Sequence, residues 1–270
     1  MFNPARLKAK TMQGQMPRRY WRNLPEAAVI PSLIADAHAR TEEMRATPAA
    51  EPLRKTARAV ARAPAGPVVN DGAVPRSTAD VWTLVQGCRR CDLWRNATQG
   101  VAGEGPRRAA IMLVGEQPGD QEDLAGKPFV GPAGALLDRL LEAAGVERED
   151  CYVTNAVKHF KFEPRGKRRL HKSPNAGEIS ACRWWYEHEV ALVKPQVIVA
   201  LGATAARQVL GRPVGLMKER GRPVPLENGA VAFLTIHPSA ALRAPDEAGR
   251  ARMRELLQAD LANAARLVAH

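Results

Sequence analysis

Residues 109–123 read AAIMLVGEQPGDQED, and this stretch decides the fold class. The six consecutive apolar residues 109–114 predict a β-strand buried on both faces, as in a parallel sheet. The glycine-bounded turn that follows, residues 115–123, carries four carboxylates. Carboxylates repel phosphate, so this turn does not fit a phosphate-binding loop or a dinucleotide fingerprint. We therefore expect the turn to supply a base, an electrostatic stabiliser or a metal ligand.

Working outward, apolar runs alternate with amphipathic stretches. We predict further strands at 152–157, 197–201 and 231–236, and helices at 77–88, 133–144, 175–193, 202–210 and 247–268. This alternation indicates an α/β fold, a three-layer sandwich with a central, mainly parallel four-stranded sheet. Ligands bind outside the carboxyl ends of such strands, which are followed here by Gly115, Asn155, Gly202 and His237.

The net charge of +12 favours a polyanionic partner, with nucleic acid as the first choice. Half of this excess lies in residues 1–80, and most of the rest lies in residues 158–172, KHFKFEPRGKRRLHK, with seven basic residues and one acidic. Phe160 and Phe162 lie within this run, a pattern typical of a loop that follows a nucleic-acid backbone and stacks on bases. A solvated surface loop is the alternative interpretation.

The composition also predicts the domain organisation. Residues 46–77 contain five prolines and no aromatic residue, which predicts a disordered linker. We expect a helical segment in 1–45 and the folded domain in 78–270. No stretch is long and apolar enough for a membrane span, and no secretory leader is evident, so we expect a cytoplasmic protein with no membrane partner. We expect a monomer, although the sequence carries no signal for the oligomeric state.

Four cysteines are too few for a disulfide scaffold in a chain of this size. The Cys88-x-x-Cys91 spacing by itself leaves zinc, iron–sulfur and redox sites open.

Four segments together resemble the motifs of the uracil-DNA glycosylase superfamily, in the same order along the chain. They are GEQPG (115–119), PFVGPAG (128–134), VTNAVK (153–158) and IHPSA (236–240). The resemblance covers roughly residues 88–267 and is nearest to the iron–sulfur family 4 branch. Gln117, where family 4 usually has alanine, and the segment GKRRLH (166–171) resemble the UdgX branch. Residues 16–31 are similar to the tail of a DUF4130-type domain, which implies that 1–45 is a helical remnant able to contact such a domain.

The resemblance implies a site for uracil in DNA, preferably single-stranded. Phe129 would stack on uracil, and Asn155 would read its O4 and N3–H edge. Backbone amides around Gln117 and Asp120 would receive O2, with Gly115 and Gly119 shaping the turn. His237 would face the charge that develops on O2 when the glycosidic bond breaks.

The UdgX resemblance further implies that His171 captures the sugar C1′ in a stable covalent adduct, with Glu116 holding the imidazole. Gln117 would help position the loop or uracil. The expected DNA contacts are Lys167, Arg168, Arg169, Lys172 and Ser239. Three alternatives stay open: a conventional family 4 enzyme with turnover, a module that binds uracil-DNA without cleaving it, and a zinc-bearing structural DNA-binding protein.

For the cofactor, the resemblance implies a [4Fe–4S] cluster held by Cys88, Cys91, His159 and Cys182. His159 stands where the family normally has its remaining cysteine, so Cys151 is the competing ligand. Because these positions bracket the basic segment, we expect the cluster to be a structural staple.

Overall fold

The computed structural model describes residues 73–268. The predicted helical segment 1–45 lies outside the described residues, as does most of the predicted linker. The first described helix is α2 (Thr78–Val85), whose N-cap Ser77 accepts a hydrogen bond from the Asp80 amide at 3.1 Å. Among the described residues, no helix combines the length and apolarity needed to cross a membrane.

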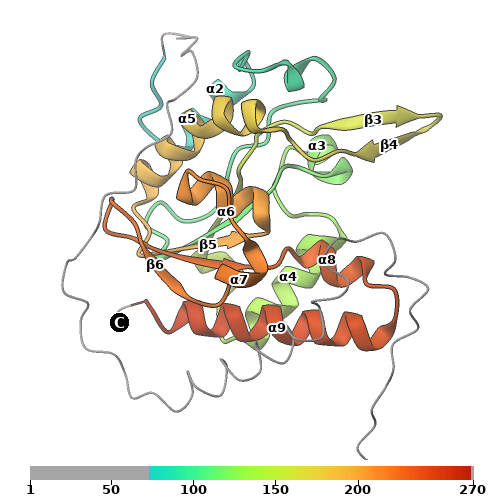
Figure 1. The fold of residues 1–270 in the computed structure, drawn as a ribbon. Helices are drawn as coiled ribbons and strands as arrows, with labels where there is room; N and C mark the ends of the chain where they lie inside the picture. Colours follow the sequence, from blue (N-terminus) through green and yellow to red (C-terminus); the bar gives the residue numbers. More distant parts are fainter. Residues whose placement is uncertain (1–72, 269–270) are drawn as a thin grey trace, which may run out of the picture. The chain divides into compact units, whose positions relative to one another are not determined.

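The central sheet confirms the α/β fold class, although it has five strands where the sequence predicts four (Figure 1). Its order is β2-β1-β5-β7-β6. The parallel strands are β1 (Ile111–Gly115), β2 (Cys151–Asn155), β5 (Val197–Leu201) and β7 (Val231–Thr235). The added strand, β6 (Pro223–Pro225), pairs antiparallel with β7 at the edge. Two of its three residues are prolines, which are tolerated at an edge because no neighbour needs their missing N–H groups.

Helices cover both faces of the sheet, as a three-layer sandwich requires (Figure 1). One layer contains α4 (Pro132–Ala143), α8 (Pro238–Arg243) and α9 (Glu247–Ala265), and the other contains α5 (Ala176–Val193) and α6 (Ala203–Leu210). Adjacent residues of β1 pack in the apolar cores on opposite faces of the sheet. Leu113 packs with the leucines of α4 and α9, whereas Met112 packs with Tyr186 of α5. A third apolar cluster joins α2 to α5. The shorter elements are η1 (Asp92–Arg95), α3 (Asp120–Ala125), η2 (Arg148–Asp150) and α7 (Leu216–Glu219).

The basic segment forms an antiparallel hairpin, β3 (Phe162–Arg165) and β4 (Arg168–His171), that projects from the body beside α3 (Figure 1). The segment predicted as a loop is therefore an ordered hairpin over residues 162–171. A two-residue turn, Gly166 and Lys167, joins the strands, and Gly166 has φ +59°, a conformation that glycine adopts without strain.

Candidate active site

Gly115, Asn155 and Phe129 converge at the carboxyl ends of β1 and β2. Gly115 and Asn155 are register partners in the sheet. A Cβ atom on Gly115 would lie 2.4 Å from Asn155 Oδ1 and 2.6 Å from Phe129 Cζ, so only glycine leaves room for both side chains. Asn155 is almost fully buried. The structure thus brings together three residues that the sequence assigns to one ligand.

Phe129 also lies against His237, which precedes α8 on the neighbouring side of the site. The ring centroids are 5.9 Å apart, with an interplanar angle of 28°. Phe129 has φ +57°, and its carbonyl would lie 1.8 Å from a Cβ on Gly134, so the first turn of α4 closes tightly over this residue. A non-glycine residue in the left-handed region is held there by its surroundings, as is typical of functional sites.

His237 is held as a neutral imidazole. Its Nδ1 accepts a hydrogen bond from the Ser239 backbone N–H at 3.1 Å and lies 2.7 Å from Ser239 Oγ. A backbone amide can only donate, so the ring proton is on Nε2. Burial lowers the pKa of His237 to about 4, and electrostatic interactions with Arg243 and His171 act in the same direction. At neutral pH this side chain therefore presents an N–H donor without a full charge. Ser239, predicted as a DNA contact, orients that donor.

Glu116 connects the hairpin to α6. Its Oε1 lies 3.4 Å from His171 Nε2, and its Oε2 accepts a hydrogen bond from Thr204 Oγ1 at 2.7 Å. Burial lowers the pKa of His171, and the Glu116 carboxylate opposes this shift. The sequence did not indicate Thr204, although it follows closely on Gly202 at the end of β5, one of the four strand ends named above.

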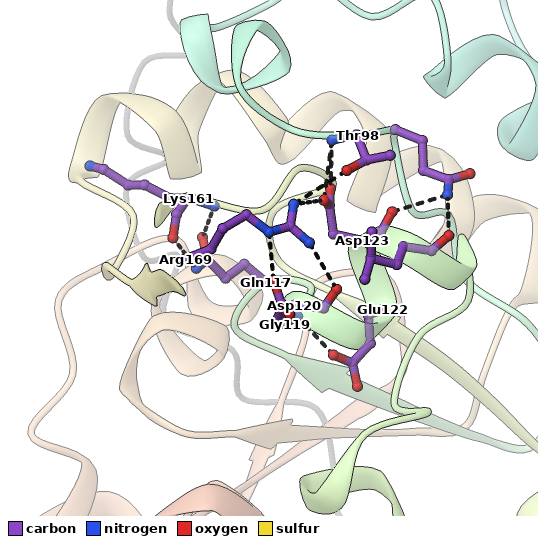
Figure 2. Close-up of polar contacts among 10 residues, drawn as sticks. Thr98, Gln117, Gly119, Asp120, Glu122, Asp123, Lys161 and Arg169 are labelled. Carbon is purple, nitrogen blue, oxygen red and sulfur yellow. Dashed lines mark hydrogen bonds and ion pairs between the residues drawn. The ribbon is translucent and has the colours of Figure 1, made fainter. Parts of the chain in front are cut away.

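Gln117 fastens the root of the hairpin, as Figure 2 shows for its contacts with Lys161. The side-chain amide donates to the carbonyls of Lys161 and Lys172, each at 3.1 Å, and accepts from the Lys161 amide at 3.1 Å. Because Lys161 and Lys172 flank the hairpin, one side chain fixes both of its ends. The role of Gln117 in positioning this segment or uracil stays a prediction.

Arg169 ties the hairpin to α3 (Figure 2). Its guanidinium lies 2.5 Å from Asp120 Oδ1, 2.5 Å from Asp123 Oδ2 and 3.2 Å from Thr98 Oγ1. The Asp123 side chain is fully buried and also accepts the Thr98 amide. Arg169, predicted as a DNA contact, thus has its guanidinium committed to carboxylates of the protein. In the same region, the Glu122 carboxylate accepts the amides of Gly119 at 3.0 Å and Gly131 at 2.8 Å, which joins the turn to the start of α4.

Other basic residues of segment 158–172 are also paired. Lys158 is fully buried, and its Nζ lies 2.6 Å from Glu189 Oε2 and 2.8 Å from the Asn155 carbonyl. Lys161 pairs with Glu178 at 2.9 Å, and Lys172 pairs with Glu163 at 2.7 Å. Within the described residues, three exposed cations of this segment have no carboxylate at ion-pair distance: Arg165, Lys167 and Arg168. The cations of this segment that have no carboxylate partner among the described residues thus lie at the tip of the hairpin.

Three of the four cysteines lie in the α2–α5 cluster, and no cysteine of the described residues forms a disulfide. Cys88 Sγ accepts the Trp185 indole N–H at 3.1 Å, and Cys182 Sγ accepts the Lys158 amide at 3.3 Å. Burial and the neighbouring Cys91 raise the pKa of Cys182 to about 12.

The competing ligand, Cys151, packs instead in the separate core between the sheet and α4. His159 is buried, and desolvation lowers its pKa to about 4, so the imidazole is neutral and chemically able to act as a ligand. The donor types thus suit a sulfur-rich centre. Nevertheless, no group of three or more His, Cys, Asp or Glu side chains between residues 73 and 268 has the arrangement of a metal site.

The family model described as the uracil DNA glycosylase superfamily matches residues 102–261, more than half of the chain. This chain belongs to the uracil-DNA glycosylase superfamily. The matched range in this uracil-DNA glycosylase superfamily member includes the Gly115 turn, the hairpin, Cys182 and His237, whereas Cys88 and Cys91 precede it.

Curated relatives agree with this assignment. The type-4 uracil-DNA glycosylase of Thermotoga maritima is 41% identical over 160 residues, covering 59% of this chain and 80% of that protein. The type-4 enzyme of Sulfurisphaera tokodaii is 35% identical over 184 residues, covering 65% and 78%. A type-5 uracil-DNA glycosylase of Pyrobaculum aerophilum is 31% identical over 143 residues, covering 47% and 60%.

Proposed function

We propose that this protein removes uracil from DNA by cleaving the N-glycosidic bond. The main observation that supports this activity is that Phe129 and Asn155 converge over Gly115, next to His237, which is held as a neutral hydrogen-bond donor. The names of the type-4 relatives support the same activity. Single-stranded DNA is the preferred substrate in this proposal, because extracting a base from a duplex costs a few kcal/mol more.

Each side chain has a role in this reaction. The Phe129 ring stacks on uracil, and the planar Asn155 amide pairs with the O4 and N3–H edge. His237 Nε2–H donates to O2, and this bond strengthens as the departing uracil becomes an anion. The amides near Gln117 and Asp120 donate toward the same oxygen. Because His237 stays neutral, it gives up no proton to the leaving group and acts as an electrostatic stabiliser.

A uracil-release assay under single-turnover conditions tests this proposal. Wild type should release uracil from a uracil-containing oligonucleotide but no thymine from its matched counterpart. His237→Ala should lower the rate by about 10²–10³, the usual loss for one such donor. His188→Ala, a histidine of α5 outside the site, is the matched control and should retain the wild-type rate. Release of no uracil by folded wild type overturns the proposal.

The fate of the sugar is the finer part of the proposal: His171 captures C1′. The bond between C1′ and uracil N1 breaks, and its electron pair leaves with uracil. One imidazole nitrogen then supplies the pair for a new bond to C1′, while Glu116 holds or takes up the proton of the other nitrogen. Support comes from the 3.4 Å separation of His171 and Glu116, from the exposure of about half of the His171 side chain, and from the two fastenings of the hairpin.

A denaturing gel separates capture from conventional turnover. Wild type incubated with uracil-containing single strands should give a band that persists in SDS, and His171→Ala should give none. His171→Ser should leave room for water, so alkali should reveal abasic sites instead of a shifted band. If wild type yields many abasic sites per protein and no shifted band, the conventional family 4 reaction is correct. Binding without any uracil release would instead identify a non-cleaving module.

We also propose that Cys88, Cys91, His159 and Cys182 hold a [4Fe–4S] cluster, which supplies a structural cross-link between α2, α5 and the root of the hairpin. The shared α2–α5 cluster of the three cysteines and the N–H donors to Cys88 and Cys182 support this assignment. Iron analysis and visible absorbance test it. Cys182→Ser and His159→Ala should lose the iron–sulfur absorbance, and Cys151→Ser should retain it. Loss of absorbance in Cys151→Ser alone would overturn the ligand set, and zinc in place of iron would exclude the cluster.

A further inference from the structure

A groove lies between β4 and α3. Its lining is Asp120, Leu124, Lys167, Arg168, Arg169 and Leu170. Figure 1 shows β4 running beside α3. Arg169 crosses between the two walls through its contacts with the Asp120 carboxylate and the Asp120 carbonyl (Figure 2). The ion pairs fix the separation of the walls, so the groove is formed before any ligand binds.

Two leucines are exposed on the walls of this groove. Leu124 of α3 is 61% exposed, and Leu170 of β4 is 36% exposed. Neither belongs to the three apolar core clusters. Two exposed leucines facing one groove offer an apolar surface to a flat ligand.

The charge of the groove suits an anion. Asp120 would repel an anion, and Arg169 offsets this charge only in part because its guanidinium also pairs with Asp123. The positive excess of the groove therefore comes from Lys167 and Arg168. Lys167 and Arg168 have no carboxylate partner within the part of the chain that the structure describes, and Arg168 lies directly across the hairpin from Arg165. Like charges at opposed positions of a hairpin destabilise it. A bound phosphate would relieve this repulsion.

We propose that this groove is a subsite for one nucleotide that flanks the uracil on the same strand. Its base lies on Leu124 and Leu170, and its phosphate lies between Lys167 and Arg168. The subsite rests on the proposed function, and it adjoins the proposed uracil pocket because Asp120 belongs to both. It gives Leu124, a residue outside the reaction itself, a role in holding the strand.

Oligonucleotides with a base-free sugar spacer test the subsite. The spacer is placed, in separate oligonucleotides, at each of the three positions on either side of the uracil. The half-saturating DNA concentration for single-turnover uracil release is then measured. At one position, loss of the base should raise this concentration for wild type by about threefold or more, since the apolar contact is lost.

Leu124→Ser should raise the half-saturating concentration for intact DNA and should abolish the effect of that one spacer. Leu267→Ser, which changes an exposed leucine just after α9, is the matched control and should respond to the spacer as wild type does. A flat spacer profile in wild type, or an unchanged spacer effect in Leu124→Ser, overturns the subsite while the proposed function stands. Absence of uracil release from every oligonucleotide overturns the proposed function and the subsite together.

Discussion

Truncation of Arg169 should detach the hairpin from α3 without unfolding the sheet. Among residues 73–268, Arg169→Ala leaves the fully buried Asp123 carboxylate with only the Thr98 amide as a donor, at 3.0 and 3.1 Å. Stranding a buried charge entirely costs about 3–5 kcal/mol, and the remaining amide reduces this to about 2 kcal/mol. The Asp120 pair adds less than about 1 kcal/mol because Asp120 is half exposed. The free energy of docking the hairpin onto α3 should therefore weaken by about 2–3 kcal/mol, which shifts the docking equilibrium by roughly 30- to 150-fold.

Hydrogen exchange of the amides in 162–172, measured by mass spectrometry, reports this equilibrium directly. Exchange should accelerate in Arg169→Ala, and the rate of the proposed capture by His171 should fall with it. The control is Arg165→Ala, which removes an exposed arginine of the same hairpin that has no carboxylate partner among residues 73–268. If the two variants exchange at the same rate, Arg169 does not fasten the hairpin and the reasoning fails.

Three further predictions follow from the pocket. Gly115→Ala should abolish uracil release, because the added Cβ would overlap Asn155 and Phe129. The control Gly87→Ala should be active, because its Cβ would have its nearest neighbour at 3.7 Å. Equal activity of the two variants would contradict this geometry. The folded-state pKa of His237, about 4, lies below its ordinary value of 6.5, so the unfolded chain binds more protons between these values. Neutral His237 therefore makes its full contribution to the free energy of unfolding above about pH 6.5, and this contribution is lost as the pH falls toward 4. The urea concentration at the midpoint of unfolding should differ more between pH 7 and pH 5 for wild type than for His237→Gln. Ser239→Ala removes the hydroxyl but keeps the hydrogen bond from the backbone N–H of residue 239 to His237 Nδ1. Uracil release should therefore slow by less than about tenfold, whereas His237→Ala should cause a much larger loss.

The parallel strands of the sheet could be predicted because buried strands are rich in apolar residues. Every residue of β2 and β5 is buried, and the continuous apolar run VIVAL identifies β5, whereas β2 ends in the buried polar residues Thr154 and Asn155. The edge strand β6 could not be identified this way, because a three-residue stretch with two prolines carries no strand pattern. The hairpin was also missed, because its residues are mostly charged and exposed and so lack an apolar alternation.

The members of the site could be predicted from motifs, but the partners of its charges could not. Arg169 meets Asp120 and Asp123, and Lys158 meets Glu189, across long separations in sequence. A count of basic residues cannot show such pairs, so it overestimates the charge available to DNA. Thr204 gave no signal, because a threonine in the first turn of a helix is ordinary and only the fold places it on Glu116.

The number of uracil molecules released per protein molecule tests the central claim most directly. Wild-type protein is mixed with a large excess of uracil-containing single-stranded DNA, and free uracil is quantified over time. Capture by His171 predicts a rapid burst that stops near one uracil per protein, and continued release in His171→Ser. Steady release of many uracils per wild-type molecule would contradict capture, and no release would contradict the glycosylase activity itself.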